Sequence, residues 1–229
     1  MNLYNSYDMD VESAYIIRLR GHSNSEALAE RCANSCTKVG MPHAFWDAFD
    51  GTVSPIAAPP QVSGDSFLRM LKVTNHFLSR TEVACALSHI SLWSHCAQID
   101  KPIVVLEHDA VMVAPFRVHP LYNSIIYLGC QEQMAGWSVL PTPPHGSDGP
   151  NFHFILRAHA YALDPAVARS LLTHCLKYGI NESADKLVRA DIFPIHQMGL
   201  FAYDDPQEST INHLHSDDMT DKRNDRMER

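Results

Sequence analysis

Two acidic residues follow a strongly apolar segment in the middle of the chain. Ile103–Leu106 is a continuous apolar run of strand length, and Glu107, His108 and Asp109 come directly after it. Such a run is typical of a central parallel strand that is covered on both faces. Alternate residues of an extended segment face the same side, so the two carboxylates predict a site for a hard divalent cation. The alternative is an acidic turn after a buried strand, because short motifs often occur without function.

The elements around this segment predict an α/β domain. Apolar runs predict strands at Ala14–Leu19, His43–Ala48, Ile103–Leu106, Ser124–Leu128, Ile155–Leu163 and near Leu200–Tyr203. Apolar periodicity and capping residues predict helices at Glu26–Val39, Ser79–Gln98, Asp164–Tyr178 and Ser183–Arg189. Strands that alternate with helices favour a mostly parallel sheet flanked by helices. Such sheets bind ligands at the carboxyl ends of their strands, which is where the two acids stand.

Composition and charge predict one acidic globular domain. The 229 residues include 18 Lys and Arg against 26 Asp and Glu, a formal net charge of −8 at pH 7. A protein with this net charge lacks the overall positive charge that would hold an anionic membrane or nucleic acid. A local basic patch is nevertheless compatible with it. No apolar segment reaches the roughly 18–20 residues that span a bilayer, and from the polar N-terminus we expect no signal peptide. We therefore expect a cytoplasmic protein with one domain over residues 1–215 and a polar tail over 216–229.

The predicted central helix and the strand after it carry a series of short motifs. The series is Glu82, Cys85, Leu87-Ser88-His89, Trp93 and Glu107-x-Asp109. It resembles the hallmark of glycosyltransferase family twenty-five, which includes lipooligosaccharide galactosyltransferases and collagen galactosyltransferase domains. Further segments resemble the family in the same order, namely Tyr15–Arg20, Ala48–Gly51, Tyr127–Gly129, Ala160–Leu172, Ser183–Val188 and Asp205–Ile211. The order of the motifs makes the resemblance specific, although each motif alone is weak.

The resemblance implies a GT-A-like, Rossmann-like fold and a nucleotide-sugar donor, for which we expect a UDP-sugar. It also implies a divalent cation, Mn²⁺ or Mg²⁺, that neutralises the leaving nucleoside diphosphate. Asp109 is expected to contact this cation directly, with Glu107 supporting it or contacting the ribose. His213 and His215 are candidates for a further metal ligand, because imidazole suits Mn²⁺. The alternative for both histidines is solvation in a frayed tail.

Three residues are candidates for catalysis under this resemblance. Asp185 is the candidate general base for an acceptor hydroxyl, with a helix cap as the alternative. Glu82 and His89 share one helix face and are expected at the sugar or acceptor pocket. The alternatives are a capping box for Glu82, which lies three residues after Ser79, and a hydrogen-bonded buried histidine for His89.

A second group of residues is expected to bind the donor. Arg18 is the candidate for the diphosphate, because guanidinium groups bind phosphate oxygens. Asp50 and Gly51 follow a predicted strand and could hold the uracil or the ribose. Ser88 and His108 complete the set of donor-binding candidates.

The acceptor is the least determined part of this prediction. The resemblance implies a saccharide or a lipooligosaccharide, and Trp137 in a proline-rich segment could stack on an acceptor ring. An alternative acceptor is a hydroxymethylated base in phage DNA, which would place the enzyme in the host cytoplasm. This alternative rests on a possible basic track formed by Arg69, Lys72, Arg80, Lys177, Lys186 and Arg189.

Two positions depart from the family pattern. Thr81 replaces a usual glycine, and His108 replaces the middle acid of the three-residue motif. A non-catalytic module that binds nucleotide sugars therefore stays as a further alternative. The transferred sugar, a hexose or a pentose, and the oligomeric state do not follow from the sequence.

Overall fold

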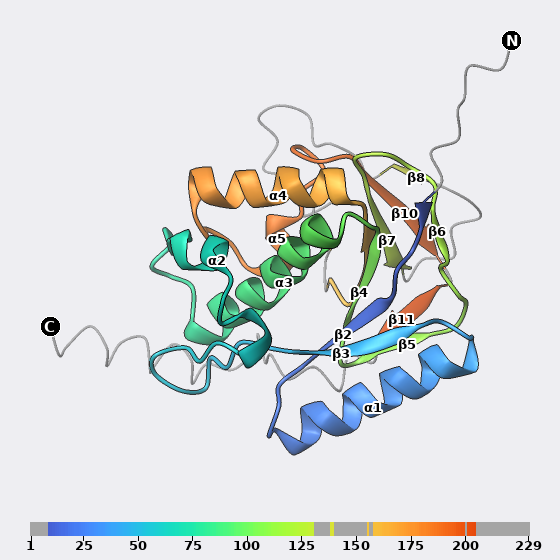
Figure 1. Ribbon diagram of the computed structural model, residues 1–229, viewed down its shortest axis with the longest axis horizontal. Helices are drawn as coiled ribbons and strands as arrows, with labels where there is room; N and C mark the ends of the chain where they lie inside the picture. The colour runs from blue at the N-terminus through green and yellow to red at the C-terminus, as the bar shows by residue number, and fades with distance from the viewer. Residues whose placement is uncertain (1–8, 131–137, 140–154, 156–157, 200, 205–229) are drawn as a thin grey trace, which may run out of the picture.

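The computed structural model describes residues 9–130, 138–139, 155, 158–199 and 201–204. Its centre is a seven-stranded sheet with the strand order β3-β2-β4-β9-β7-β10-β8 (Figure 1). The strands are β2 (Ala14–Arg18), β3 (His43–Asp47), β4 (Ile103–Glu107), β7 (Ile125–Cys130), β8 (Ser138–Val139), β9 (Ala160–Leu163) and β10 (Ile195–Gly199). Strands β3, β2, β4, β7 and β10 run in one direction, while β9 and β8 run antiparallel to their neighbours. The predicted α/β fold with a mostly parallel, Rossmann-like sheet is confirmed.

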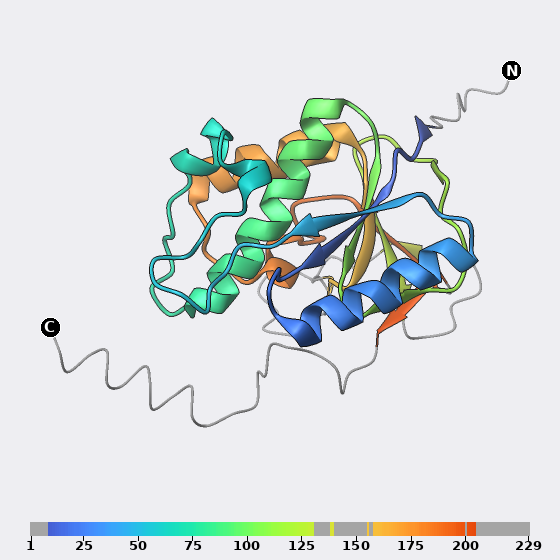
Figure 2. The same ribbon diagram turned by 60° about the horizontal axis from the view of Figure 1, so that its bottom comes forward.

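Helices cover both faces of the sheet. The long helices are α1 (Ser23–Lys38), α3 (Arg80–Ile99) and α4 (Pro165–Tyr178), and the short ones are η1 (Pro60–Val62), α2 (Ser66–Met70) and α5 (Ala184–Leu187). Alternate residues of β4 belong to two separate hydrophobic cores. Ile103 and Val105 pack with α3 and α4, while Val104 and Leu106 pack with α1 (Figures 1 and 2). Strand β4 is therefore buried from both sides, as its apolar composition predicts.

Two small two-stranded sheets flank the main sheet. Strand β1 (Met9–Asp10) pairs antiparallel with β6 (Val118–His119). Strand β5 (Ala110–Met112) pairs antiparallel with β11 (Ala202–Asp204). The chain turns at His108 and Asp109 between β4 and β5. This turn lies at the carboxyl end of β4, where the sequence places its acidic motif.

Local sequence features account for the starts of α3 and α4, which cover the same face of the sheet. Helix α3 begins with a capping box, in which the Ser79 side chain and the Glu82 side chain each bond the other's backbone N–H. Helix α4 begins after Asp164, whose side chain accepts a hydrogen bond from the Val167 N–H, and has a proline in its first turn. Both predicted starts are confirmed.

Other boundaries differ from the prediction. Strand β9 covers only the last part of the predicted strand Ile155–Leu163. Strands β5, β6 and β10 and helix α2 were not predicted, because most are too short for a periodic pattern. The proline-rich segment runs from residue 131 to 151, and only residues 138–139 of it are described. Trp137 and the predicted tail lie outside the described residues. Among the helices that the structure describes, none is long and apolar enough to cross a membrane.

Candidate functional site

The carboxyl ends of β2, β3 and β4 meet at one edge of the sheet. In the parallel register Arg18 lies opposite Asp47, and Ile17 lies opposite Glu107. The side chains that follow these three strands therefore line a common edge. In α/β sheets this edge is where ligands bind.

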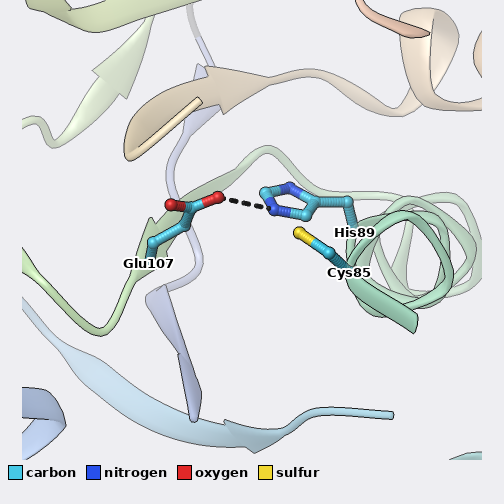
Figure 3. Close-up of side chains that lie close together, drawn as sticks. All are labelled: Cys85, His89 and Glu107. Carbon is cyan, nitrogen blue, oxygen red and sulfur yellow. Dashed lines mark hydrogen bonds and ion pairs between the residues drawn. The ribbon is translucent and has the colours of Figure 1, made fainter. Parts of the chain in front are cut away.

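Helix α3 brings Cys85 and His89 against Glu107 at this edge (Figure 3). The Cys85 Sγ, a ring nitrogen of His89 and a carboxylate oxygen of Glu107 all lie within 4.8 Å of one another. The His89 Nε2 is 3.2 Å from the Glu107 Oε1. The His89 side chain is 2% exposed, whereas that of Glu107 is 26% exposed, so the carboxylate reaches the surface and the imidazole does not. The expectation of a hydrogen-bonded buried histidine fits this geometry.

Negative charge is concentrated around Cys85. Burial is the main reason why the pKa of the Cys85 thiol is raised well above its usual value. The carboxylates of Glu107, Asp185, Asp109 and Glu82 raise this pKa further. Acidic residues from α3, α5 and the end of β4 thus act on one thiol. Of the four acids that the sequence assigns to catalysis or metal binding, Glu107 lies in close contact with Cys85 and His89, and the other three act on the thiol through their charge.

The turn after β4 is held by helix α1. The Asp109 side chain is buried, and its backbone oxygen accepts a hydrogen bond of 3.1 Å from the Arg31 Nη2. The His108 Nδ1 is 3.3 Å from the Ser25 Oγ, which itself accepts a hydrogen bond from the Leu19 N–H. Burial lowers the pKa of His108, while Glu107 opposes this shift. Because the chain turns here, strand alternation does not extend to Asp109, and its joint contact with a cation stays a prediction.

Glu82 and Asp185 have local partners in addition to their place near Cys85. The Glu82 Oε2 accepts hydrogen bonds of 2.7 Å from both the Ser79 N–H and the Ser79 hydroxyl. The capping interpretation of Glu82 is thus confirmed. The Asp185 Oδ1 accepts a hydrogen bond of 2.6 Å from the Ser183 hydroxyl in the first turn of α5. A carboxylate with one such partner keeps acceptor capacity for a further proton donor.

The candidates at the ends of β2 and β3 have structural partners. The Arg18 Nε donates a hydrogen bond of 2.9 Å to the Asp47 Oδ1, and its guanidinium lies 4.2 Å from the centre of the Phe45 ring. The Asp50 Oδ1 accepts hydrogen bonds from the N–H and the hydroxyl of Thr52, which closes a tight turn.

Ser88 and Gly51 attach the segment after β3 to helix α3. The Ser88 hydroxyl donates to the Ala84 carbonyl and accepts a hydrogen bond of 2.9 Å from the Phe49 N–H. A Cβ on Gly51 would lie 2.7 Å from the Arg80 carbonyl oxygen, so this glycine allows close packing on α3. Binding of the donor by these residues stays a prediction.

One side chain near the site was not singled out from the sequence as functional. The Tyr161 hydroxyl is 2.9 Å from the His89 Nδ1, and Tyr161 lies 72 residues away in the chain. The segment around Tyr161 resembles the family, but spacing alone does not reveal a contact of this kind. His213 and His215 lie outside the described residues, so their proposed metal ligation is not tested by the fold.

The sheet, with acids at the carboxyl ends of its parallel strands, defines a Rossmann-like α/β protein, a class in which ligands commonly bind at this edge. Residues 13–119 match the family model described as "Glycosyltransferase family 25 (LPS biosynthesis protein)". Over these residues the chain is similar to this glycosyltransferase family, in agreement with the resemblance of its motifs. The matched segment contains Cys85, His89, Glu107 and Asp109 and ends before Tyr161 and Asp185. No curated protein matches the chain.

Proposed function

We propose that the protein is a glycosyltransferase that moves a sugar from a UDP-sugar to an acceptor hydroxyl with the help of Mn²⁺ or Mg²⁺. The observation that carries the proposal is the position of Glu107 at the carboxyl end of β4, next to Asp109 in the turn that follows, within the segment that matches the family. Carboxylate oxygens are the ligands that these hard cations prefer. Like charges gathered in a partly buried site are costly unless a cation joins them.

The residues of this site have different roles in the proposed reaction. Asp109 and Glu107 are the proposed ligands that hold the cation against the donor diphosphate. The cation, when bound, supplies Lewis-acid neutralisation of the leaving UDP. Asp185 accepts the proton of the acceptor hydroxyl. At the same time the oxygen of that hydroxyl bonds to the anomeric carbon of the donor sugar, and the bond from this carbon to the diphosphate breaks. The hydrogen bond from Ser183 holds the Asp185 carboxylate in place for this role.

The proposed acceptor is a saccharide. The description of the matched family refers to LPS biosynthesis, which favours a sugar hydroxyl over a DNA base. The DNA alternative relied on six basic residues, and one of them, Arg189, forms an ion pair with Asp191. A surface pair of this kind leaves less positive charge for phosphates.

The test measures UDP release from UDP-sugars with and without saccharide acceptors. We expect exhaustive chelation to abolish turnover and Mn²⁺ to restore it. Asp109→Asn is expected to lower kcat by about 10²–10³, the range for loss of one group that stabilises transition-state charge. The matched control is Glu12→Gln, because Glu12 pairs with Lys101 on the surface. Full turnover after chelation, or wild-type turnover in a folded Asp109→Asn protein, would rule out the proposed cation site.

A further inference from the structure

A row of buried side chains ends on the Glu107 carboxylate. The Trp93 Nε1 donates a hydrogen bond of 2.9 Å to the Tyr161 hydroxyl. The Tyr161 hydroxyl is 2.9 Å from the His89 Nδ1, and the two rings are nearly parallel, with an interplanar angle of 14°. The His89 Nε2 completes the row at 3.2 Å from the Glu107 Oε1. Trp93 and Tyr161 are fully buried.

The donors in this row fix the positions of its protons. An indole N–H can only donate, so the Tyr161 oxygen accepts from Trp93. The Tyr161 O–H then donates to the His89 Nδ1, because a buried hydroxyl without an acceptor costs about 1–3 kcal/mol. In a neutral imidazole the proton therefore sits on Nε2, and Nε2 donates to Glu107. With each group donating to the next, from Trp93 to Glu107, every donor in the row has an acceptor.

Metal binding by Cys85, His89 and Glu107 fits the geometry less well. Ligation through Nε2 would move the imidazole proton to Nδ1, where it would meet the Tyr161 hydroxyl proton. The close approach of the three residues is therefore accounted for by the hydrogen bond from His89 to Glu107.

We propose that His89 is a positioning residue for Glu107, and that Trp93 and Tyr161 set the tautomer in which His89 works. This inference rests on the proposed role of Glu107 at the donor and its cation. The hydrogen bond fixes Oε1 toward α3 and leaves the second carboxylate oxygen pointing away from His89 (Figure 3). A carboxylate held in this way reaches its ligand with little loss of side-chain entropy. A buried histidine that orients an acid resembles the outer-shell partners of metal ligands.

Two substitutions of His89 separate the two ends of the row. In His89→Gln the amide nitrogen reaches the former Nε2 position and can donate to Glu107. In His89→Asn the shorter side chain can meet Tyr161 but not Glu107. We expect His89→Gln to keep kcat within about tenfold of the wild type and His89→Asn to lose roughly 10–100-fold, the range for loss of an outer-shell partner. Equal activity of the two folded variants, or better activity in His89→Asn, would overturn the inference.

A matched control uses the same substitutions on the same helix. His95 lies on α3, and its Nε2 is 2.9 Å from the Tyr15 hydroxyl. His95→Gln and His95→Asn should affect the melting temperature and not the ratio of the two kcat values. A kcat difference at His95 as large as that at His89 would show a general helix effect and would contradict the inference.

A spectroscopic measurement tests the row without sugar transfer. Nitrogen NMR of ¹⁵N-histidine-labelled protein should show His89 with its proton on Nε2, and Tyr161→Phe should weaken this preference. A proton on Nδ1 in the wild type would refute the inference even if the enzyme is active. Absence of Mn²⁺-dependent UDP release in the wild type would instead refute the proposed function, and the NMR result would still decide the proton positions.

Discussion

The ends of β2 and β3 differ from the end of β4, although they lie side by side at one edge of the sheet. At the first, opposite charges meet, since Arg18 pairs with Asp47, and the Asp50 side chain closes its own turn. At the second, Glu107 contacts a histidine, and four carboxylates raise the pKa of one thiol. The polar groups at the ends of β2 and β3 therefore have partners within the protein. The end of β4 is instead surrounded by charge of one sign.

This difference predicts which of the polar residues are structural and which are functional. Asp50 and Gly51 were assigned to the donor because they follow a predicted strand, and Arg18 because a guanidinium group binds phosphate oxygens. Neither position nor residue type alone distinguishes a ligand contact from a structural one. The charge around Cys85 adds the missing criterion, because perturbed groups in a shared site favour function. We therefore expect substitutions at the end of β4 to affect turnover and those at the ends of β2 and β3 to affect stability.

The largest expected effect comes from Glu107→Gln. The substitution keeps the shape of the side chain and removes one negative charge, so we expect kcat to fall by about 10²–10³. The melting temperature should stay the same or rise, because repulsion with the neighbouring acids is relieved. Initial rates and thermal unfolding measure the two quantities. A large loss of stability with normal turnover would show that Glu107 is structural, like the residues at the ends of β2 and β3, and would contradict the proposed difference between the two regions.

Gly51→Ala is expected to have the next largest effect, and on stability. The new Cβ would lie 2.7 Å from the Arg80 carbonyl oxygen and 2.9 Å from the Ala84 Cβ, both on helix α3. Overpacking against backbone costs about 1–3 kcal/mol of unfolding free energy, which urea denaturation can measure. Gly64→Ala is the matched control, because its Cβ would meet nothing within 4 Å. Equal stability of the two variants, with a donor KM raised in Gly51→Ala, would return Gly51 to the donor site.

The framework of this site could be predicted from the sequence because its elements carry strong local patterns. The apolar run of β4 indicates a strand buried on both faces, and Ser79 with Glu82 indicates the start of α3. Both elements are confirmed, and together they carry His89 and Glu107. Strand β10, with the sequence IHQMG, lacks an alternating or uniformly apolar pattern, and its pairing with β7 depends on tertiary structure.

The contacts within the site could not be predicted in the same way. The His89–Tyr161 bond joins α3 to β9, and no spacing rule connects residues 72 positions apart. The alternation argument for Glu107 and Asp109 assumed an extended chain, whereas the chain turns directly after Glu107. Sequence patterns specify the period within an element, and the packing of elements specifies which side chains meet.

The smallest expected effect comes from Arg18→Gln. The Arg18 and Asp47 side chains are 24% and 16% exposed, so the pair is only partly screened by water. We expect a loss of about 1 kcal/mol in unfolding free energy, near the upper end for ion pairs close to the surface. A double-mutant cycle with Asp47→Asn should assign most of this loss to the pair. If Arg18 instead contacts the donor diphosphate, the donor KM rises in Arg18→Gln while Asp47→Asn leaves it unchanged, and the two strand ends then share one function.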